Sequence, residues 1–170
     1  MESKAKLFGH AIHPILIVFP LGLLATAVIF DVISLVTGNG KWSDMAFYLI
    51  AAGIVGGIVA AIFGFIDWLA IPKGTRAKSV GLWHAVGNDV ALILFAVSWW
   101  LRWGRTTDPG ALALVLSFAG SGVTLVSGWL GGELIERLGM AVHDGAHLDA
   151  PSSLSGRPAS EGVPGKRRVD

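Results

Sequence analysis

The sequence of 170 residues contains no cysteine and few charged side chains. The lack of cysteine excludes disulfides, thiolate nucleophiles, cysteine-ligated iron–sulfur clusters and covalently attached c-type haem. Only 15% of the residues are charged, whereas soluble domains average about 25%. No basic run with interleaved aromatic residues suggests a nucleic-acid partner. Any metal or cofactor must therefore be held by histidine, carboxylate or amide groups.

Apolar residues make up 53% of the chain, and the mean hydropathy is +0.65. Four apolar segments reach the length of about 20 residues that a helix needs to cross a bilayer. They cover residues 14–37, 45–70, 82–101 and 111–130. Because the connections are short, consecutive helices must be antiparallel neighbours. The sequence therefore predicts an all-α, integral membrane four-helix bundle with up-down-up-down topology within residues 1–144, with the lipid bilayer as its partner.

The segment 145–170 is rich in Gly, Ser, Pro and charge and lacks apolar periodicity, so we expect a disordered cytoplasmic tail. Lysine and arginine near the span ends set orientation, because cytoplasmic flanks are enriched in both. The side that holds the termini carries five of them and the other side three. These residues are Lys4, Lys6, Lys73, Arg76 and Lys78 against Lys41, Arg102 and Arg105. We expect a multi-pass protein of the bacterial inner membrane with both termini in the cytoplasm.

Small residues recur every fourth position in the second and fourth segments. Gly53, Gly57 and Ala61 form one such row, and Gly120 and Thr124 begin the other. Small residues at this spacing allow helix backbones to approach closely in lipid. The rows predict tight helix packing, within the chain or in a homo-oligomer, and carry no catalytic signal.

Ionisable side chains gather at the cytoplasmic end of the expected bundle. His10 and His13 precede the first span, Asp67 ends the second, and His84 lies in the third. Asn88 is four residues after His84 and therefore shares its helix face. Because ionisable residues inside a membrane are costly, they are functional candidates by default.

This cluster supports two cofactor hypotheses. In the first, His13 or His10 from the first span and His84 from the third hold one haem b as a b-type cytochrome, because imidazole is a standard axial ligand. In the second, His10, His13, His84 and Asp67 bind zinc or iron. Metal-bound histidines usually donate their other ring nitrogen to a polar group. We expect Asn88, Asp67 or Asp89 to accept that bond.

Two hypotheses without a cofactor remain open. Asp67, Asp89 and Asp31 could form a proton or ion path with His13 and His84 as relays. Alternatively, the histidines are structural parts of a membrane or interaction protein. Electron transfer or binding is favoured over an enzymatic role.

Several short motifs resemble the domain of unknown function 2231 family, which comprises predicted four-helix bacterial membrane proteins. The resemblance spans about Gly9 to Val142. Its motifs are His13-Pro14, Phe19-Pro20, Asp67-Trp68, His84 with Asn88, and Gly131-Gly132-Glu133-Leu134. Some relatives carry a fused Rieske-type ferredoxin domain, so the resemblance implies a redox setting. Because this chain lacks cysteine, any iron–sulfur partner would be a separate redox protein.

Overall fold

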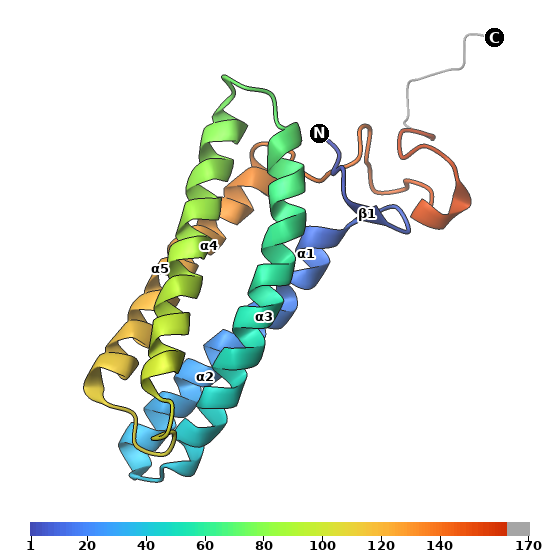
Figure 1. Cartoon of the computed structure of the whole chain (residues 1–170). Helices are drawn as coiled ribbons and strands as arrows, with labels where there is room; N and C mark the ends of the chain where they lie inside the picture. The colour runs from blue at the N-terminus through green and yellow to red at the C-terminus, as the bar shows by residue number, and fades with distance from the viewer. Residues whose placement is uncertain (163–170) are drawn as a thin grey trace, which may run out of the picture.

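A computed structural model describes residues 1–162 of the chain. Four long helical segments run side by side, as Figure 1 shows. The first is divided into α1 (Ile12–Leu16) and α2 (Val18–Thr37). The others are α3 (Lys41–Ala70), α4 (Arg76–Leu101) and α5 (Ala111–Glu136). All four are long and apolar enough to cross a membrane, which confirms the predicted all-α four-helix bundle.

The helices extend past several of the predicted span limits. A helix of 26 residues is about 39 Å long, whereas the hydrocarbon core is about 30 Å thick. The extra turns carry polar residues such as Lys41, Arg76 and Glu136. Thr75 caps the start of α4, because its hydroxyl accepts a 3.2 Å hydrogen bond from the backbone N–H of Lys78. The apolar pattern located the spans, and capping chemistry in the flanks decides where the helices end.

Proline causes the interruption between α1 and α2. Pro20 has no N–H with which to bond the carbonyl of Leu16, so the regular ladder breaks at Ile17. The chain nevertheless continues in the same direction, since Ile17 donates to His13 O and Leu21 to Ile17 O, both at 3.1 Å. The break leaves α1 as a short, separate turn that carries His13.

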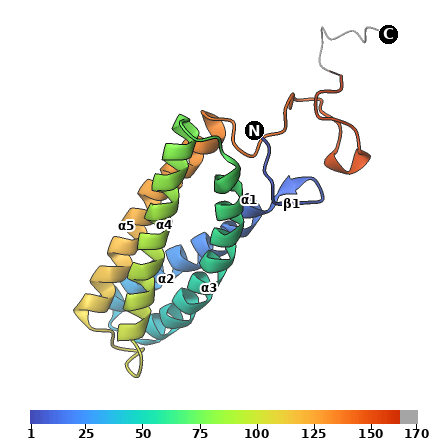
Figure 2. The ribbon, with the colours of Figure 1, turned by 45° about the horizontal axis from the view of Figure 1, so that its top comes forward.

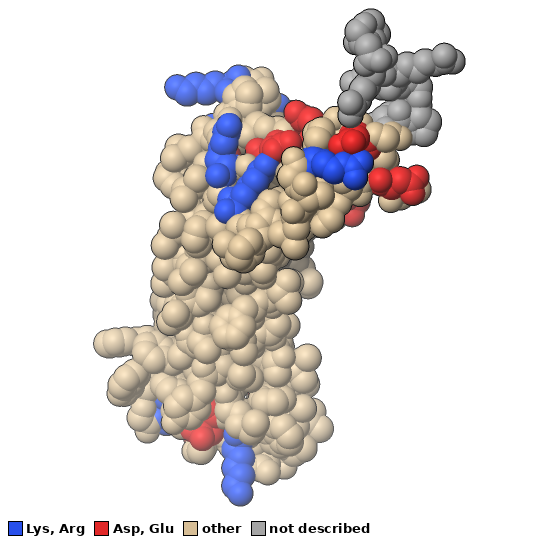
Figure 3. Space-filling model, turned by 90° about the vertical axis from the view of Figure 1, so that its right-hand side faces the viewer, with Lys and Arg blue, Asp and Glu red and all other residues tan. Residues whose placement is uncertain are grey.

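The bundle is built from two helical hairpins. The α1–α2 segment packs along α3, and α4 packs along α5, while contacts between the hairpins are sparser. Figure 2 shows the two pairs as distinct units. On the face that Figure 3 shows, charged side chains lie at both ends of the molecule, and the band between them carries none.

The two hairpins repeat the same pattern of buried positions. Asp31 and Arg102 are 71 residues apart, and the same shift relates the other buried residues of α2 to those of α4. A second constant difference in residue number relates buried residues of α3 to residues of α5. The pairs are Pro20 with Ala91, Leu24 with Phe95, Ala27 with Ser98, Asp31 with Arg102, Ala46 with Ala113, Ile50 with Ser117, Gly53 with Gly120, and Ala60 with Ser127. The two hairpins therefore match position by position, as an internal duplication of a two-helix unit would, and both enter the bundle from the same end.

One pair of the repeat forms a buried ion pair. Two guanidinium nitrogens of Arg102 donate to the two carboxylate oxygens of Asp31 at 2.7 and 2.6 Å, and both side chains are fully buried. Ser43 and Ser117 also donate to Asp31, and Ser98 accepts from Arg102. Sequence reasoning placed Arg102 in a loop flank and found no partner for Asp31, because the pair forms only when the hairpins dock.

The glycines of α3 face the protein interior. A Cβ atom on Gly53 would lie 2.7 Å from the Leu24 side chain, and one on Gly57 would lie 2.6 Å from Leu92. Leu24 belongs to the same hairpin and Leu92 to the other. The small-residue row of α3 therefore serves packing within the chain.

The N-terminal residues and the segment that follows α5 meet over one end of the bundle. A hairpin of β1 (Lys6–Leu7) and β2 (His10–Ala11) precedes α1. The Met1 ammonium donates to Gly139 O at 2.9 Å, and Ala141 N–H donates to Met1 O at 3.0 Å. We call residues 1–11 and 137–144 the cap. A hydrogen bond from Lys6, reinforced by the nearby charges, holds the pKa of Glu2 in the cap below its usual value.

The predicted disordered tail is described only as far as residue 162. Residues 145–162 form turns and a short 3-10 helix, η1 (Ser153–Ser155), and residues 163–170 lie outside the described part of the chain. His147 Nε2 donates to Glu161 O at 3.0 Å within this segment. An ion pair between Arg157 and Glu161 and a contact between Ser153 and His10 add to its polar turns.

Candidate functional site

His13 is held in a fixed orientation at the start of the first membrane segment. Its Nδ1 donates to the backbone carbonyl of Ala60 on α3 at 2.8 Å, and the ring is half-buried. The facing residue one turn further along α3 is Gly64, where a Cβ atom would lie 2.9 Å from Nδ1 and Cε1 of the ring. With its proton on Nδ1, the neutral imidazole keeps a lone pair on Nε2.

His84 repeats this arrangement in the second hairpin. Its Nδ1 donates to the backbone carbonyl of Ser127 on α5 at 2.8 Å. The residue one turn after Ser127 is Gly131, where a Cβ atom would lie 2.9 Å from the ring. Ala60 and Ser127 are a pair of the repeat, and so are Gly64 and Gly131 by the same shift. The two histidines are therefore equivalent positions of the duplicated unit.

The two imidazoles meet between the hairpins. Their ring centroids are 6.3 Å apart and their planes are nearly perpendicular, at 88°. Metal–nitrogen bonds of about 2 Å, added to a ring radius of about 1.1 Å on each side, give about 6 Å for two imidazoles on opposite sides of one metal ion. The observed separation is close to that value and also lies within the range of about 4.5–7 Å for edge-to-face ring contacts.

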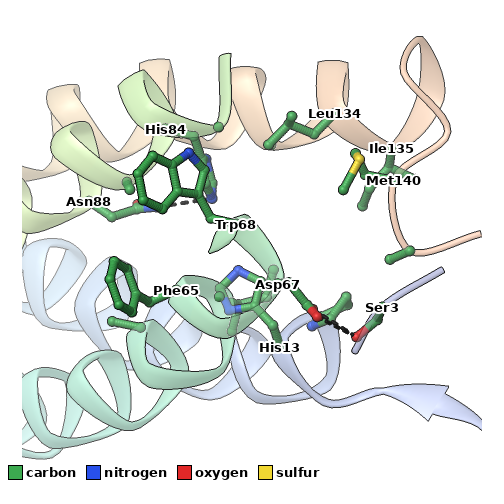
Figure 4. Close-up of a pocket in the computed structure, with 18 of the residues that line it drawn as sticks. Ser3, His13, Phe65, Asp67, Trp68, His84, Asn88, Leu134, Ile135 and Met140 are labelled. Carbon is green, nitrogen blue, oxygen red and sulfur yellow. Dashed lines mark hydrogen bonds between the residues drawn. The ribbon is translucent and has the colours of Figure 1, made fainter. Parts of the chain in front are cut away.

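A cavity of about 650 Å³ surrounds the facing rings. Apolar side chains such as Phe65, Trp68 and Leu92 form most of its wall, and the cap closes one end with Met140. Figure 4 shows His84, Asn88 and Trp68 across this space from His13 and Phe65. A cavity of several hundred cubic ångströms with few polar groups is typical of cofactor sites.

His10 lies apart from the two paired histidines. It is an exposed residue of β2, and its Nε2 accepts from or donates to Ser153 Oγ at 3.2 Å. Sequence reasoning placed it one helical turn from His13, but the helix begins only at Ile12. The β-hairpin thus separates it from the cavity.

Asp67 binds the N-terminal residues of the cap. Its carboxylate accepts from the Ser3 hydroxyl at 2.8 Å, from Lys4 N–H at 2.7 Å and from Ala5 N–H at 3.2 Å. It borders the cavity, as Figure 4 shows, but its oxygens are directed to these donors. Within residues 1–162 no three His, Asp or Glu side chains lie close enough together to share a metal ion. The proposed four-residue metal set of His10, His13, His84 and Asp67 is not assembled.

Asn88 and Asp89 border the same cavity on α4. The Asn88 amide bonds to His84 Nε2 at 3.1 Å, so it contacts the nitrogen on the cavity side of the ring. The backbone carbonyl of Ser127 takes the orienting position at Nδ1 for which the sequence suggested a side chain. Asp89 is exposed, and its carboxylate has no hydrogen bond or ion pair within residues 1–162.

Sequence reasoning missed the two glycines that accommodate the rings and the two carbonyls that orient them. Gly64 was counted only among the small residues of its segment, and Gly131 was named only as part of a family motif. The available signal was the 71-residue shift, which aligns His13 with His84 and Leu21 with Leu92. Few other residues are identical under this shift, so the duplication is visible mainly as a pattern of burial.

Fold and site together define a four-span membrane protein with a cavity between two equivalent histidines. The chain belongs to the DUF2231 family, described as predicted membrane proteins, whose model matches residues 9–144. This match confirms the resemblance drawn from the motifs. Searches of curated proteins and of solved structures give no match.

Proposed function

We propose that the protein is a b-type cytochrome that binds one haem between its hairpins and transfers electrons in the membrane. The observation that carries this proposal is the pair of facing imidazoles, 6.3 Å apart, each fixed through Nδ1 by a backbone carbonyl. Histidine in haem and metal sites is commonly held in this way, with the second ring nitrogen free for the metal.

The residues fit haem b in three respects. His13 and His84 would supply two imidazole ligands from opposite hairpins, and no cysteine is needed. Gly64 and Gly131 leave room for the rings, where a Cβ atom would collide. The cavity is large and mainly apolar, which suits a flat macrocycle and excludes water. Binding requires the Asn88 amide to turn away from His84 Nε2, a side-chain rotation of a single residue.

Zinc or a single iron ion fits less well. Protein-bound zinc has three or four protein ligands in nearly all sites. The described residues bring together two histidines and no third histidine or carboxylate. Two equivalent ligands facing each other match the two axial positions of haem, whereas a tetrahedral ion needs ligands from more directions.

When bound, the haem iron would supply one-electron redox chemistry. The chain's own part is to hold the rings through the carbonyls of Ala60 and Ser127, and to keep water out with the apolar cavity wall. The charge distribution near the span ends favours both termini, and thus the site, on the cytoplasmic side of a bacterial inner membrane. A separate redox protein would exchange electrons at that surface.

The direct test is an absorption spectrum of the purified, haem-supplied protein before and after dithionite reduction. We expect Soret and α bands of a six-coordinate, low-spin haem at one haem per chain. A protein that is folded but shows no such bands after haem supply refutes the proposal. Elemental analysis of the same sample then tests zinc and iron directly.

The glycines beside the rings give a second test of this proposal. Gly131→Ala or Gly64→Ala places a methyl group 2.9 Å from the imidazole and must displace the ring. We expect haem affinity to fall about 10-fold or more, the size of effect seen when orienting groups at metal ligands are lost. Titration of the purified apoprotein with haem measures it.

Gly122→Ala is the matched control, because it lies on α5 as well and has no atom within 4 Å of the added Cβ. Its haem affinity should equal that of the unmodified protein. Equal affinity of Gly131→Ala and Gly122→Ala would show that the ring position does not matter.

A further inference from the structure

Beside the cavity, the two halves of the duplicated unit differ in the residues one turn after each histidine. One turn after His13 the repeat has Ile17 and Val18, and one turn after His84 the equivalent positions are Asn88 and Asp89. The bond from Asn88 to His84 Nε2 has no counterpart at His13, and it accounts for Asn88 but not for Asp89. The second half has acquired a polar pair that the first half lacks.

Asp89 lies deep in the membrane-spanning part of α4. It is about 20 Å along the helix axis from Arg76, which is well inside a hydrocarbon core about 30 Å thick. The side chain is exposed and borders the cavity, with no polar partner in residues 1–162. An intramembrane carboxylate is costly and marks a functional position by default.

The cavity meets the lipid beside Asp89. On the α3 side its wall includes Ile58, Ile62 and Phe65, whose side chains are 53%, 55% and 56% exposed. The same side chains therefore face both the cavity and the surface. Between α3 and α4 a molecule dissolved in the bilayer can reach the space between the histidines without passing through water.

We infer that this α3–α4 opening binds a membrane-soluble hydroquinone and that Asp89 accepts the proton of its phenolic hydroxyl. The inference rests on the proposed haem site as the electron acceptor. Three features select this class of substrate: access from lipid, a one-electron acceptor beside the opening, and a carboxylate that can take a proton. The aromatic ring of Phe65 offers a face against which a quinone ring can stack.

Oxidation of one hydroquinone to the quinone releases two electrons and two protons, so two haem-loaded chains would each accept one electron. Both phenolic O–H bonds break in the process, and each proton goes to Asp89 of the protein that receives the electron. The protons then leave to water, so two are released for each hydroquinone oxidised.

The experiment follows reduction of the haem-loaded, oxidised protein in nanodiscs after decylubiquinol is added, in a stopped-flow spectrometer. Asp89→Asn keeps the shape of the side chain and removes proton acceptance. We expect reduction by decylubiquinol to slow about 100-fold, the usual size of a general-base effect. Reduction by dithionite should be unchanged. Asp108→Asn, which alters an exposed carboxylate in the α4–α5 loop, is the matched control and should reduce normally.

A second variant tests the opening itself. Ile62→Trp places a larger side chain on the α3 side of the opening. Tryptophan is the residue that α5 already carries at the equivalent position, Trp129. We expect it to weaken binding of decylubiquinone to the haem-free protein, measured by quenching of tryptophan fluorescence, at least 10-fold. This binding readout needs no haem.

The outcomes separate the two proposals. If the protein gives no haem spectrum, the proposed function fails, whether or not the protein binds quinone. If dithionite reduces the haem and decylubiquinol reduces Asp89→Asn as fast as the unmodified protein, the role of Asp89 is refuted alone. Unchanged quinone binding by Ile62→Trp refutes the opening as the binding site.

Discussion

Replacing Arg102 by alanine should lower the free energy of unfolding by about 3–5 kcal/mol, the cost of leaving a buried charge without its partner. Asp31 and Arg102 are both fully buried, and their bidentate bonds at 2.7 and 2.6 Å join α2 of one hairpin to the end of α4 in the other. Without the guanidinium, the Asp31 carboxylate keeps only the hydroxyls of Ser43 and Ser117. Unfolding of the detergent-solubilised protein in SDS, followed by tryptophan fluorescence, measures the change.

The double variant Asp31→Leu, Arg102→Met is the control. Replacing a buried ion pair by apolar side chains of similar size is often neutral or stabilising. The double variant should therefore recover most of the stability that Arg102→Ala loses. If Arg102→Ala unfolds within about 1 kcal/mol of the unmodified protein, the pair does not hold the hairpins together.

The ion pair also shows which parts of the fold could be predicted from the sequence. Hydropathy and length located all four helices, because a membrane span needs a long apolar run and little else. Asp31 and Arg102 are 71 residues apart, and no local pattern links them. A contact of this kind depends on how two hairpins dock, and neither apolar periodicity nor helix length specifies docking.

The candidate site was predicted in part. Sequence reasoning singled out His13 and His84 because an imidazole beside or within a span is costly, and the structure brings these two together. It also included His10, which the spacing appeared to place on the same helix, but a β-hairpin intervenes. The orienting carbonyls of Ala60 and Ser127 had no signal at all, because every residue has a backbone carbonyl and only the fold selects which one meets a ring.

The structure also changes the meaning of the small-residue rows. Glycine every fourth residue indicates close packing, but it does not say what packs against it. Gly53 and Gly57 of α3 meet leucine side chains, whereas Gly64, further along α3, and Gly131 of α5 meet imidazoles. One pattern therefore serves helix packing in the middle of the bundle and ring placement at the end that holds the cavity.

Replacing either His13 or His84 by alanine should remove the low-spin haem spectrum and reduce the haem content of the purified protein more than 10-fold. Each substitution deletes one of two ligands, which costs at least as much as losing a group that only orients a ligand. Pyridine haemochrome assays give the haem content, and spectra of the residual haem give its coordination. Added imidazole should restore the six-coordinate spectrum in part, because it fits the space that the deleted ring leaves.

The duplicated architecture adds a condition that a chance pair of histidines would not meet. His13 and His84 are equivalent positions of the repeat, each held through Nδ1 by a backbone carbonyl, so the two alanine variants should lose haem to a similar extent. His10→Ala is the matched control, since that exposed ring is bonded to Ser153 outside the cavity, and it should keep a full haem load. A full load in His84→Ala, or a loss in His10→Ala equal to that in His13→Ala, would contradict ligation by the two repeat-related rings.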